Sequence, residues 1–475
     1  MVGTQNKQLD RQKRKIRKLL ADNQALEEQV QDQKKEITKT KRELTRTKHK
    51  LEEVQEALRV ARLPANSSNS SRPPSTDIYK PRRSNSYSLR QKTGRKPGGQ
   101  PGHKGSTLEF CTDAPDQEIE HMVERCTACG KDLSGIAGER DSVHQVVDIA
   151  IPKRILINHT TITKYCTCGK CNKASFPPGA KGPVNYGNKL RGLVANLSVR
   201  QHMPYKREVE FIEDIFGIKM SQGTVTNLLG QVEQSARATY EQIQQEVGTA
   251  SVVGADETGA KVNGARNWFH VYQTPEQTFI GFHPSRGTDA QETFYPIGFP
   301  ESTLVSDCLH MQLSTPAKRH QACHPHLERE LKAMEEAWPK EQWPKKTKTL
   351  FKAAVALQNT DANCKEIQKI ESQFKRLITT DQSEAPGKIS AFWKRMNKHS
   401  DKIFTFLYYP DVPANNNASE RAIRCIKVKQ KVSGQFKTEK GAHQFAVIRS
   451  VIDTLIKQNK NVHEGLAHIA SFAPS

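Results

Sequence analysis

Residues 251–258, SVVGADET, are the most informative part of the sequence for its fold. They form a short apolar run, as expected of a buried strand, and the run leads into Asp256. A second such run, STLV at residues 302–305, leads into Asp307, and two β-rich segments between residues 268 and 282 separate the runs. If these strands are neighbours, Asp256 and Asp307 lie side by side at one edge of a sheet.

A pair of carboxylates at a sheet edge suits two divalent cations. Two such ions ~3.5–4 Å apart need hard oxygen ligands, and together they stabilise the attacking and leaving oxygens of phosphoryl transfer. The expected third acid is Glu420, in the stretch NNNASERAIR at 415–424, whose Asn and Ser residues are typical helix caps. Alternation along a strand directs Glu257 to the opposite face. Spacing alone leaves open that each acid is a surface turn residue.

The first sixty residues show a seven-residue apolar period. The positions seven apart are Leu9, Ile16, Asn23, Val30, Ile37, Leu44, Leu51 and Leu58. Leu19, Leu26 and Val54 fall three residues after members of that row. This is the pattern of the a and d positions of a coiled coil, where one buried Asn favours two strands. We expect residues 1–62 to be a coiled-coil dimerisation helix, as a parallel dimer.

Residues 63–110 are rich in Ser, Asn, Pro, Gly and basic residues. Between 61 and 105, ten basic residues stand against one acid, which leaves a charge of +9. Such a stretch cannot bury enough apolar surface to order itself. We expect a disordered basic arm in which Arg95, Lys96 and Lys104 follow DNA phosphates, a role that is compatible with a solvated linker.

Five cysteines between residues 126 and 171 predict a small zinc module. Cys126 and Cys129 form one CxxC pair, and Cys168 and Cys171 form the second, with Cys166 as an alternative ligand. Two such pairs can close a tetrahedral four-thiolate Zn²⁺ site. The pairs are further apart than usual, so a short hairpin is expected between them. Unrelated buried thiols are the other interpretation.

Residues 183–248 are expected to be helical. The segments on either side of residues 217–221 resemble a helix-turn-helix, with Ser221 as the N-cap of the second helix. That helix has no Arg or Lys between Ser221 and Ala236, which favours packing over DNA recognition.

A second metal site is one interpretation of Cys323 and His326, which are three residues apart in an expected helix. Because few ligands are visible, a structural or substrate-contacting role is favoured. Arg329, one turn beyond His326, shares that face and can reach a phosphate.

A second set of basic residues follows the third acid. Arg421 and Arg424 belong to its helix, and apolar and basic residues alternate over 426–432. On an extended chain, Lys427, Lys429 and Lys431 share one face, which is suited to the DNA backbone, although an ordinary solvated strand gives the same pattern.

Composition narrows the class of protein. The 475 residues include 73 Lys and Arg against 51 Asp and Glu, a net charge of +22, which points to nucleic acid as the partner. No apolar run reaches the ~18 residues of a membrane span, and the N-terminus lacks the apolar core of a signal peptide. We therefore expect neither a membrane protein nor a secreted one, and we interpret the ten cysteines as thiols and metal ligands.

Several motifs occur in one order along the chain. They are SSRPPSTD at 70–77, the Gly- and Lys-containing stretch 94–105, the paired CxxC motifs, DET at 256–258, HQACHPHLEREL at 320–331, residues 416–424, and SGQF at 433–436 with Gly441, Phe445, Ile448, Arg449 and Ser450. With these motifs the sequence resembles transposases of the insertion sequence 66 family, the large subunit that carries a DDE catalytic domain. The resemblance covers nearly the whole chain.

The resemblance implies a ribonuclease-H-like fold in which Asp256, Asp307 and Glu420 are the DDE triad. The triad would bind two Mg²⁺ ions, or Mn²⁺, nick the element ends and direct the freed 3′-hydroxyl at target DNA. It also implies a helical insertion between the second and third acids, and accessory proteins of the same element as partners. Cys308 and Ser419 replace residues that are more usual in the family, which are small departures.

The sequence thus predicts a multidomain α+β protein. The expected parts are the coiled coil 1–62, the arm 63–110, the zinc module 111–182, the helical region 183–248, the catalytic domain 249–310 and 411–460, the helical insertion 311–410, and the tail 461–475. The expected partners are double-stranded DNA and a second copy of the chain, in the cytoplasm at the bacterial nucleoid. The intact triad favours a transposase over a catalytically silent DNA-binding copy. The zipper and arm favour it over a ribonuclease-H-like nuclease without strand transfer.

Overall fold

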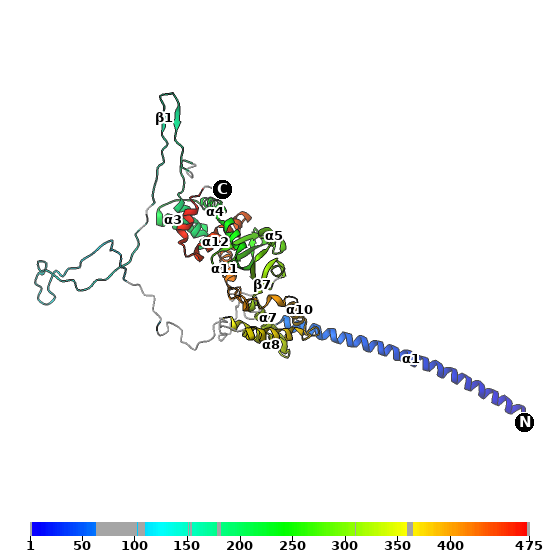
Figure 1. Ribbon diagram of the computed structural model, residues 1–475. Coiled ribbons are helices and arrows are strands. Elements are labelled where there is room, and N and C mark those ends of the chain that lie inside the picture. The colour runs from blue at the N-terminus through cyan, green and yellow to red at the C-terminus, as the bar shows by residue number, and fades with distance from the viewer. Residues whose placement is uncertain are drawn as a thin grey trace. The chain divides into compact units, whose positions relative to one another are not determined.

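The computed structural model describes residues 2–62, 102, 110–150, 152, 154–177, 182–308, 310–358 and 364–472. The chain divides into two compact units, and Figure 1 follows their elements along the sequence. The helical unit consists of Met1–Pro81, His326–Ala353 and Gln368–Asn397, and the sheet unit of Arg82–Pro325, Ala354–Ile367 and Lys398–Ser475. Among the described helices, none has the length and apolarity that a membrane crossing requires.

The sheet unit contains both β-sheets. Its strands are β1 Thr163–Tyr165, β2 Cys171–Lys173, β3 Val252–Val262, β4 Ala265–Gln273, β5 Thr278–His283, β6 Phe299–Ser306 and β7 Ala317–Ala322. Its helices are α2 Asn188–Ala195, the π-helix η2 Asn196–Arg200, α3 Tyr205–Phe216, α4 Gln222–Thr249, α5 Thr288–Phe294, α6 His310–Ser314, the short 3-10 helices η3 Ser400–Lys402 and η4 Thr405–Leu407, α11 Asn417–Ser433, α12 Glu439–Lys457 and α13 Val462–Ile469.

Five strands form the main sheet in the order β5-β4-β3-β6-β7. β3, β4 and β5 are antiparallel neighbours, while β6 and β7 run parallel to β3. The parallel register pairs Ala255 of β3 with Ser306 of β6. Asp256 and Asp307 directly follow this pair. The predicted neighbourhood of the two acid-bearing strands is therefore confirmed, and the chain is mixed α+β as expected.

Two strands differ from the sequence-based expectation. β3 does not end before Asp256 but continues to Val262 in a hairpin with β4, so Asp256 lies within the strand. β7, with the sequence AKRHQA, is the fifth strand of the main sheet, although the segment 311–410 is expected to be helical. The long helical segment begins only after β7, at α7.

Helices α11 and α12 cover the antiparallel half of the sheet. α11 packs against β3 and β4, and α12 packs against β5 and α4. At the edge strand β5, the N–H of Ile280 donates to the hydroxyl of Ser450 (2.8 Å), and the N–H of Thr278 donates to that of Thr454 (3.2 Å). These α12 hydroxyls satisfy backbone groups that an edge strand would otherwise leave unpaired. Phe269 is among the fully buried core residues.

The segment from α3 to α4 has the predicted helix, turn and helix. Gly217 ends α3 in the left-handed conformation (φ 63°), and the hydroxyl of Ser221 accepts a hydrogen bond from the N–H of Thr224 (3.1 Å). The predicted N-cap is therefore confirmed. The buried face of α4 includes Val225 and Val232, in agreement with a packing role for this helix.

The helical unit consists of α1 and most of four later helices. These are α7 His324–Ala337, α8 Gln342–Leu357, α9 Cys364–Thr379 and α10 Gly387–Lys398. The indole N–H of Trp343 donates to the carbonyl of Leu377 (2.9 Å), and Arg395 pairs with Glu330 (2.7 Å). These helices lie in the sequence between the second and third acids, where the family resemblance implies a helical insertion.

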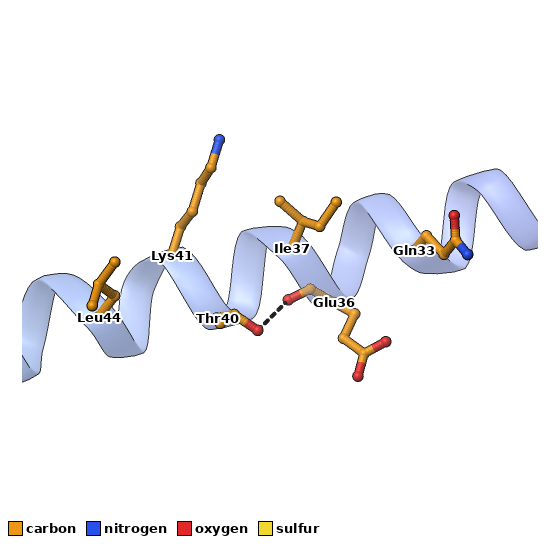
Figure 2. A pocket seen from close by; sticks show the side chains of 6 residues that line it. All are labelled: Gln33, Glu36, Ile37, Thr40, Lys41 and Leu44. Atoms are coloured by element: carbon orange, nitrogen blue, oxygen red, sulfur yellow. Dashed lines mark hydrogen bonds between the residues drawn. The ribbon is translucent and has the colours of Figure 1, made fainter.

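The helix α1, Val2–Ala61, exposes its apolar row from Ile16 to Leu58 on the surface of the chain. Figure 2 shows the side chains that line a pocket on this helix, among them Ile37 and Leu44, which are one heptad apart. Their exposed fractions are 55% and 54%. Thr40, between them, donates its hydroxyl hydrogen bond to the carbonyl of Glu36 (2.9 Å). A row of large apolar side chains is thus exposed along this helix.

Candidate functional site

The three predicted acids come from three elements of the sheet unit. Asp256 lies in β3, Asp307 follows the end of β6, and Glu420 lies in the first turn of α11. All three side chains belong to half-buried residues. The register of β3 and β6 makes the first two neighbours, because their preceding residues are paired. The predicted helix for Glu420 is confirmed.

The electrostatics of Asp256 couple it to the other acids. Burial raises the pKa of the Asp256 carboxyl well above its ordinary value, and the negative charges of Asp307, Glu257 and Glu420 raise it further. The N–H of Glu257 donates to the Asp256 carboxylate (2.8 Å), which acts in the opposite direction on this pKa. The site therefore concentrates negative charge in a poorly solvated place.

Asn416 fixes the start of α11 against β3. Its side-chain amide donates to the carbonyl of Ala255 (2.7 Å), the residue directly before Asp256. Asn416 occupies the N-cap position of α11, but its side chain makes no capping bond there. The Asn416 side chain thus contacts β3 instead of capping the helix, as had been expected. The N–H of Glu420 donates to the Asn416 carbonyl (3.1 Å), so this contact also sets the position of Glu420.

Gly254 permits this close approach of helix and strand. A Cβ on Gly254 would lie 2.5 Å from the side-chain nitrogen of Gln273, 2.6 Å from the hydroxyl of Ser419 and 3.2 Å from the side-chain oxygen of Asn416. Contacts under 3.0 Å force the neighbours to move. Neither Gly254 nor Asn416 can be recognised as a site residue from the motifs alone. The only local signal was a glycine inside an apolar strand, which often marks close backbone approach.

Cys323 connects the ends of β6 and α11. Its N–H donates to the carbonyl of Ser306 (2.9 Å), and its sulfur accepts the N–H of Asn416 (3.2 Å). Cys323 precedes α7 rather than lying in it. Its thiol and the Asp307 carboxylate offer ligand atoms within 4.8 Å of each other, a combination of metal-ligating groups. His326, the other residue of the expected second site, follows where the chain enters the helical unit.

Glu257 makes an ion pair beside the acids. Its carboxylate accepts hydrogen bonds from Nε (2.9 Å) and Nη2 (2.6 Å) of Arg286, and one from the side-chain amide of Gln312. Burial raises the pKa of Glu257, while the hydrogen bonds and charge of Arg286 lower it. Arg286 and Gln312 are site residues that the sequence analysis did not identify, because no pattern connects them to Asp256.

Divalent cations suit the donor types at this site. Asp256, Asp307 and Glu420 offer hard carboxylate oxygens, and a cation held among them would relieve the repulsion that raises the Asp256 pKa. Across the described part of the chain, however, the ligand atoms of these three acids do not all lie within 4.8 Å of one another. The residue types therefore suit a pair of divalent cations.

The cysteines form two similar turns. The carbonyl of Cys126 accepts the N–H of Gly130, and the carbonyl of Cys166 accepts that of Gly169, both at 2.9 Å. The two glycines have φ values of 73° and 86°. Hydrogen bonds from the backbone of Cys129 and of Cys168, respectively, are the main reason why the pKa values of Cys126 and Cys166 are lowered.

Cys166 occupies the same position in the second turn as Cys126 does in the first, and Cys168 the same position as Cys129. In each turn a glycine follows the second cysteine and donates its N–H to the carbonyl of the first. Cys171 lies instead in β2, paired with Tyr165 of β1. This hairpin encloses the second turn, whereas the sequence led us to expect a hairpin between the two cysteine pairs. Within the described residues, the two turns do not meet in a group of three or more thiols within 4.8 Å.

The predicted DNA-contacting residues fall into three places. Arg95, Lys96 and Lys104 lie outside the described residues, and Arg329 is a half-buried residue of α7 in the helical unit. The others lie on α11: Arg421, Arg424, Lys427, Lys429 and Lys431.

The extended chain expected over 426–432 was wrong, because this segment is the second half of α11. On a helix, residues two apart point in different directions. Lys429 accordingly turns inward, where it donates to the carbonyl of Ser198 (3.4 Å) and lies over the Tyr205 ring. Arg421, Arg424, Lys427 and Lys431 are exposed, at helical spacings of three and four.

Residues 183–444, more than half of the chain, match the family described as transposase IS66 family. The chain belongs to this family. The resemblance expected from the sequence motifs is thereby confirmed. Residues 4–109 match a family of unknown function, DUF6444. No curated protein matches the chain.

The IS66 match contains the whole candidate site of this transposase. It begins before α2, includes all three acids and the exposed face of α11, and ends within α12. α1 falls in the other matched segment, and the cysteine turns lie between the two matches. Membership implies an enzyme of a mobile element that acts on DNA with divalent metal.

Proposed function

We propose that this transposase cuts the ends of its element and joins the freed 3′-hydroxyl ends to target DNA by two-metal phosphoryl transfer. Asp256, Asp307 and Glu420 are the proposed DDE triad that holds the cations. The proposal is carried by the neighbourhood of Asp256 in β3, Asp307 just after β6 and Glu420 in α11, since the charges of the other two raise the pKa of Asp256.

The sheet topology supports a ribonuclease-H-like catalytic domain. Three antiparallel strands, β3 to β5, are followed by two strands parallel to β3 on its other side. In this arrangement the first strand is central, and its neighbour on the parallel side supplies the second acid. The helix that carries the third acid packs against the same central strand.

The chain's own residues perform three tasks in the proposed reaction. The triad carboxylates hold the cations, whose charge would activate the attacking oxygen and stabilise the leaving one. Asn416 and Gly254 set the distance between the first turn of α11 and β3. Arg286 compensates the Glu257 carboxylate, so that Glu257 does not add an uncompensated charge beside Asp256.

The exposed cations of α11 are proposed to contact the DNA backbone next to the triad. Arg421, Arg424, Lys427 and Lys431 lie along the same helix as Glu420. We retain Arg95, Lys96, Lys104 and Arg329 as proposed phosphate contacts, and we leave out Lys429 because its side chain is half-buried and turns inward, toward Ser198 and Tyr205. Neutralising phosphates with such side chains releases counterions, which makes binding strongly dependent on salt.

Two further parts of the proposal concern α1 and the cysteine turns. The exposed apolar row of α1 supports a parallel coiled-coil dimer, which would bring two element ends together. The low-pKa thiols support a structural Zn²⁺ site that takes Cys126 and Cys129 from one turn. For the second turn we propose Cys166 and Cys168, with Cys171 as the alternative, because Cys166 matches Cys126 in backbone hydrogen bonding.

Strand cleavage of a labelled duplex that carries the native element ends tests the function. We expect nicking with Mg²⁺ and none with EDTA. Asp307→Asn, Asp256→Asn and Glu420→Gln should each reduce cleavage by about 10²- to 10³-fold, since removal of one preorganised charge-stabilising group costs ~2.7–4 kcal/mol. DNA binding should be unchanged in all three.

The matched control is Glu301→Gln. Glu301 lies near the start of β6, whereas Asp307 follows the end of this strand. The Glu301 side chain is 75% exposed. It should cleave as the unmodified protein does. Near-normal cleavage by any triad variant would remove that residue from the proposed site, and binding without cleavage by the unmodified protein would indicate a silent DNA-binding copy.

A further inference from the structure

A cationic and aromatic surface lies beside the proposed catalytic site, on the hairpin of β3 and β4. The antiparallel register pairs Gly259 with Trp268 and Lys261 with Arg266. Glu257 is two residues before Gly259, so it shares this face of the sheet with Trp268 and Arg266. Asp256 points to the opposite face, toward α11.

Two guanidinium groups lie over the same indole ring. The guanidinium carbon of Arg266 is 4.5 Å from the centroid of the Trp268 ring, and that of Arg286 is 4.8 Å from it. Such contacts hold an Arg in one orientation while its N–H groups remain able to bind a planar anion. We call Arg266, Trp268 and Arg286 the hairpin triplet.

Arg286 is anchored on one side and exposed on the other. Its Nε and Nη2 both donate to Glu257, whose side chain is 4% exposed, while the Arg286 side chain is 47% exposed. An anchored guanidinium loses little conformational entropy when it binds a phosphate. The Glu257 pair also requires positive charge at this position, so the cation stays next to the acids.

Gly259 brings the triplet together with α11. A Cβ at this position would lie 3.2 Å from Nε of Arg266, so the absence of a side chain gives the guanidinium room to lie against the strand. On the other side, the ammonium of Lys427 donates to the Gly259 carbonyl (2.7 Å). The positive charge of Arg266 contributes to a lowered pKa of Lys427, after burial, so the two cations are neighbours.

The triplet lies within the reach of DNA that is bound at the acids. Gly259 is three residues from Asp256 along an extended strand, a distance of roughly 10 Å at about 3.3 Å per residue. One DNA strand carries a phosphate about every 3.4 Å of helix axis. Asp256 and the triplet point to opposite faces, and Lys427 of α11, whose ammonium meets the Gly259 carbonyl, lies between them. A DNA strand that enters the carboxylate site and continues past Lys427 therefore has phosphates a few nucleotides away near these guanidinium groups.

We propose that the hairpin triplet is a second contact for the DNA backbone, which holds the strand next to the scissile phosphate. This inference rests on the proposed function for its substrate. Two oriented guanidinium groups beside a carboxylate cluster fit a polyanion that continues past the metal site. A small anion would need only one of them.

DNA binding in EDTA tests this contact without cleavage. The substitutions are Arg266→Gln, Arg286→Lys, and both together, with binding of the labelled end duplex measured from 50 to 200 mM salt. Each lost phosphate contact should weaken binding roughly 5- to 10-fold at 0.1 M salt and reduce the slope of log K against log salt by about 0.9. We expect this full loss for Arg266→Gln and a smaller one for Arg286→Lys, which keeps the charge but loses the anchored fork.

Lys318→Gln is the matched control. The Lys318 side chain is also 47% exposed and also pairs with a glutamate, Glu301, but it lies near the start of β7, away from the acid-bearing strand ends. It should leave the affinity and the salt slope unchanged. Thermal unfolding of each variant checks the fold, because Arg266 and Lys318 are exposed and neither should shift the midpoint.

The outcomes separate this inference from the proposed function. Unchanged affinity and slope in Arg266→Gln and in the double variant would overturn the contact even if the unmodified protein cleaves. If the unmodified protein binds but does not cleave, and the variants bind more weakly, the contact stands and the catalytic proposal fails. If Arg266→Gln lost only as much DNA affinity as Lys318→Gln, the loss would reflect the change in net charge rather than a specific contact. That result would also overturn the contact.

Discussion

Gly254 lies where α11 packs against β3, next to the proposed catalytic acids. It lies two residues before Asp256, and Ser419, the neighbour of Glu420, lies over it. Its missing side chain lets the first turn of α11 approach the strand that carries the first acid. Ser419, which departs from the residue expected in this family, is completely buried at this contact.

Gly254→Ala should therefore move α11 away from β3. The added Cβ would overlap Gln273 and Ser419, and overpacking of this kind costs about 1–3 kcal/mol of unfolding free energy. We expect a lower thermal midpoint and weaker cleavage, with DNA binding retained. Gly223→Ala is the control, because a Cβ there meets only the Ser221 hydroxyl, at 3.5 Å. Equal behaviour of the two variants would contradict this role.

Glu208 is a buried carboxyl outside the catalytic site. It is 0% exposed, and it accepts a hydrogen bond from the hydroxyl of Ser198. Burial raises its pKa to about 7, against the opposing effects of Ser198 and of the Lys429 ammonium. The folded protein therefore holds a proton on this group over a pH range where the unfolded chain has lost it.

This difference makes stability depend on pH. Because the folded state binds the extra proton, the unfolding free energy contributed by Glu208 falls as the pH rises from its ordinary value of 4.5 to about 7. The full effect is about 3 kcal/mol. We expect Glu208→Gln to flatten the decline of the thermal midpoint between pH 5 and 8, and the exposed Glu210→Gln on the same helix to leave it unchanged. Parallel curves for all three proteins would exclude this assignment.

Among the elements, the cysteine turns allow the sharpest choice between ligands. Cys166 starts the second turn as Cys126 starts the first, whereas Cys171 belongs to the short strand β2. The spacing of the sequence favours Cys171, and the backbone geometry favours Cys166. Only one of the two is needed to complete four thiolates.

Zinc content per chain distinguishes them. We expect Cys166→Ser to lose most of its bound Zn²⁺ and Cys171→Ser to retain it, because a serine hydroxyl cannot replace a thiolate ligand. Atomic absorption after dialysis against a chelator measures this, with the exposed Cys364→Ser as the control. The reverse result would restore the pair Cys168 and Cys171.

At the scale of the whole molecule, α1 exposes a long row of large apolar side chains to water. Its apolar row stays exposed over most of a sixty-residue helix, about 90 Å at 1.5 Å per residue. Water-exposed Ile and Leu at seven-residue spacing are stabilised when a second helix covers them. A dimer would also double the number of phosphate contacts for paired element ends.

Ile37→Asn with Leu44→Asn should dissociate the proposed coiled-coil dimer. Loss of large apolar residues from a buried position costs roughly 2–5 kcal/mol per site. Thr38→Asn with Thr45→Asn is the matched control, since it also introduces two Asn residues seven apart, one residue further along the helix and outside the apolar row. Sedimentation should give a monomer mass for the first protein and a dimer mass for the second. Identical masses would show that this row does not hold the copies together.

Local patterns were enough to predict much of this transposase. The apolar runs before Asp256 and Asp307, the N-cap at Ser221 and the helix around Glu420 depend on residues that are close together in the sequence. β7 was missed because its sequence, AKRHQA, has no strand-like alternation, and only its pairing with β6 makes it a strand. The lysines of α11 were placed on a strand because their alternation resembles one, although the helix continues through them.

Residue types and their spacing were sufficient to predict the candidate acids, the strands that lead to them and the family. Only the tertiary structure decided how the acids are held. The amide of Asn416 meets the carbonyl of Ala255 across 161 residues of sequence, and Arg286 meets Glu257 across 29. No local pattern encodes such contacts, since they arise when packing brings α11 and the strands of one sheet together.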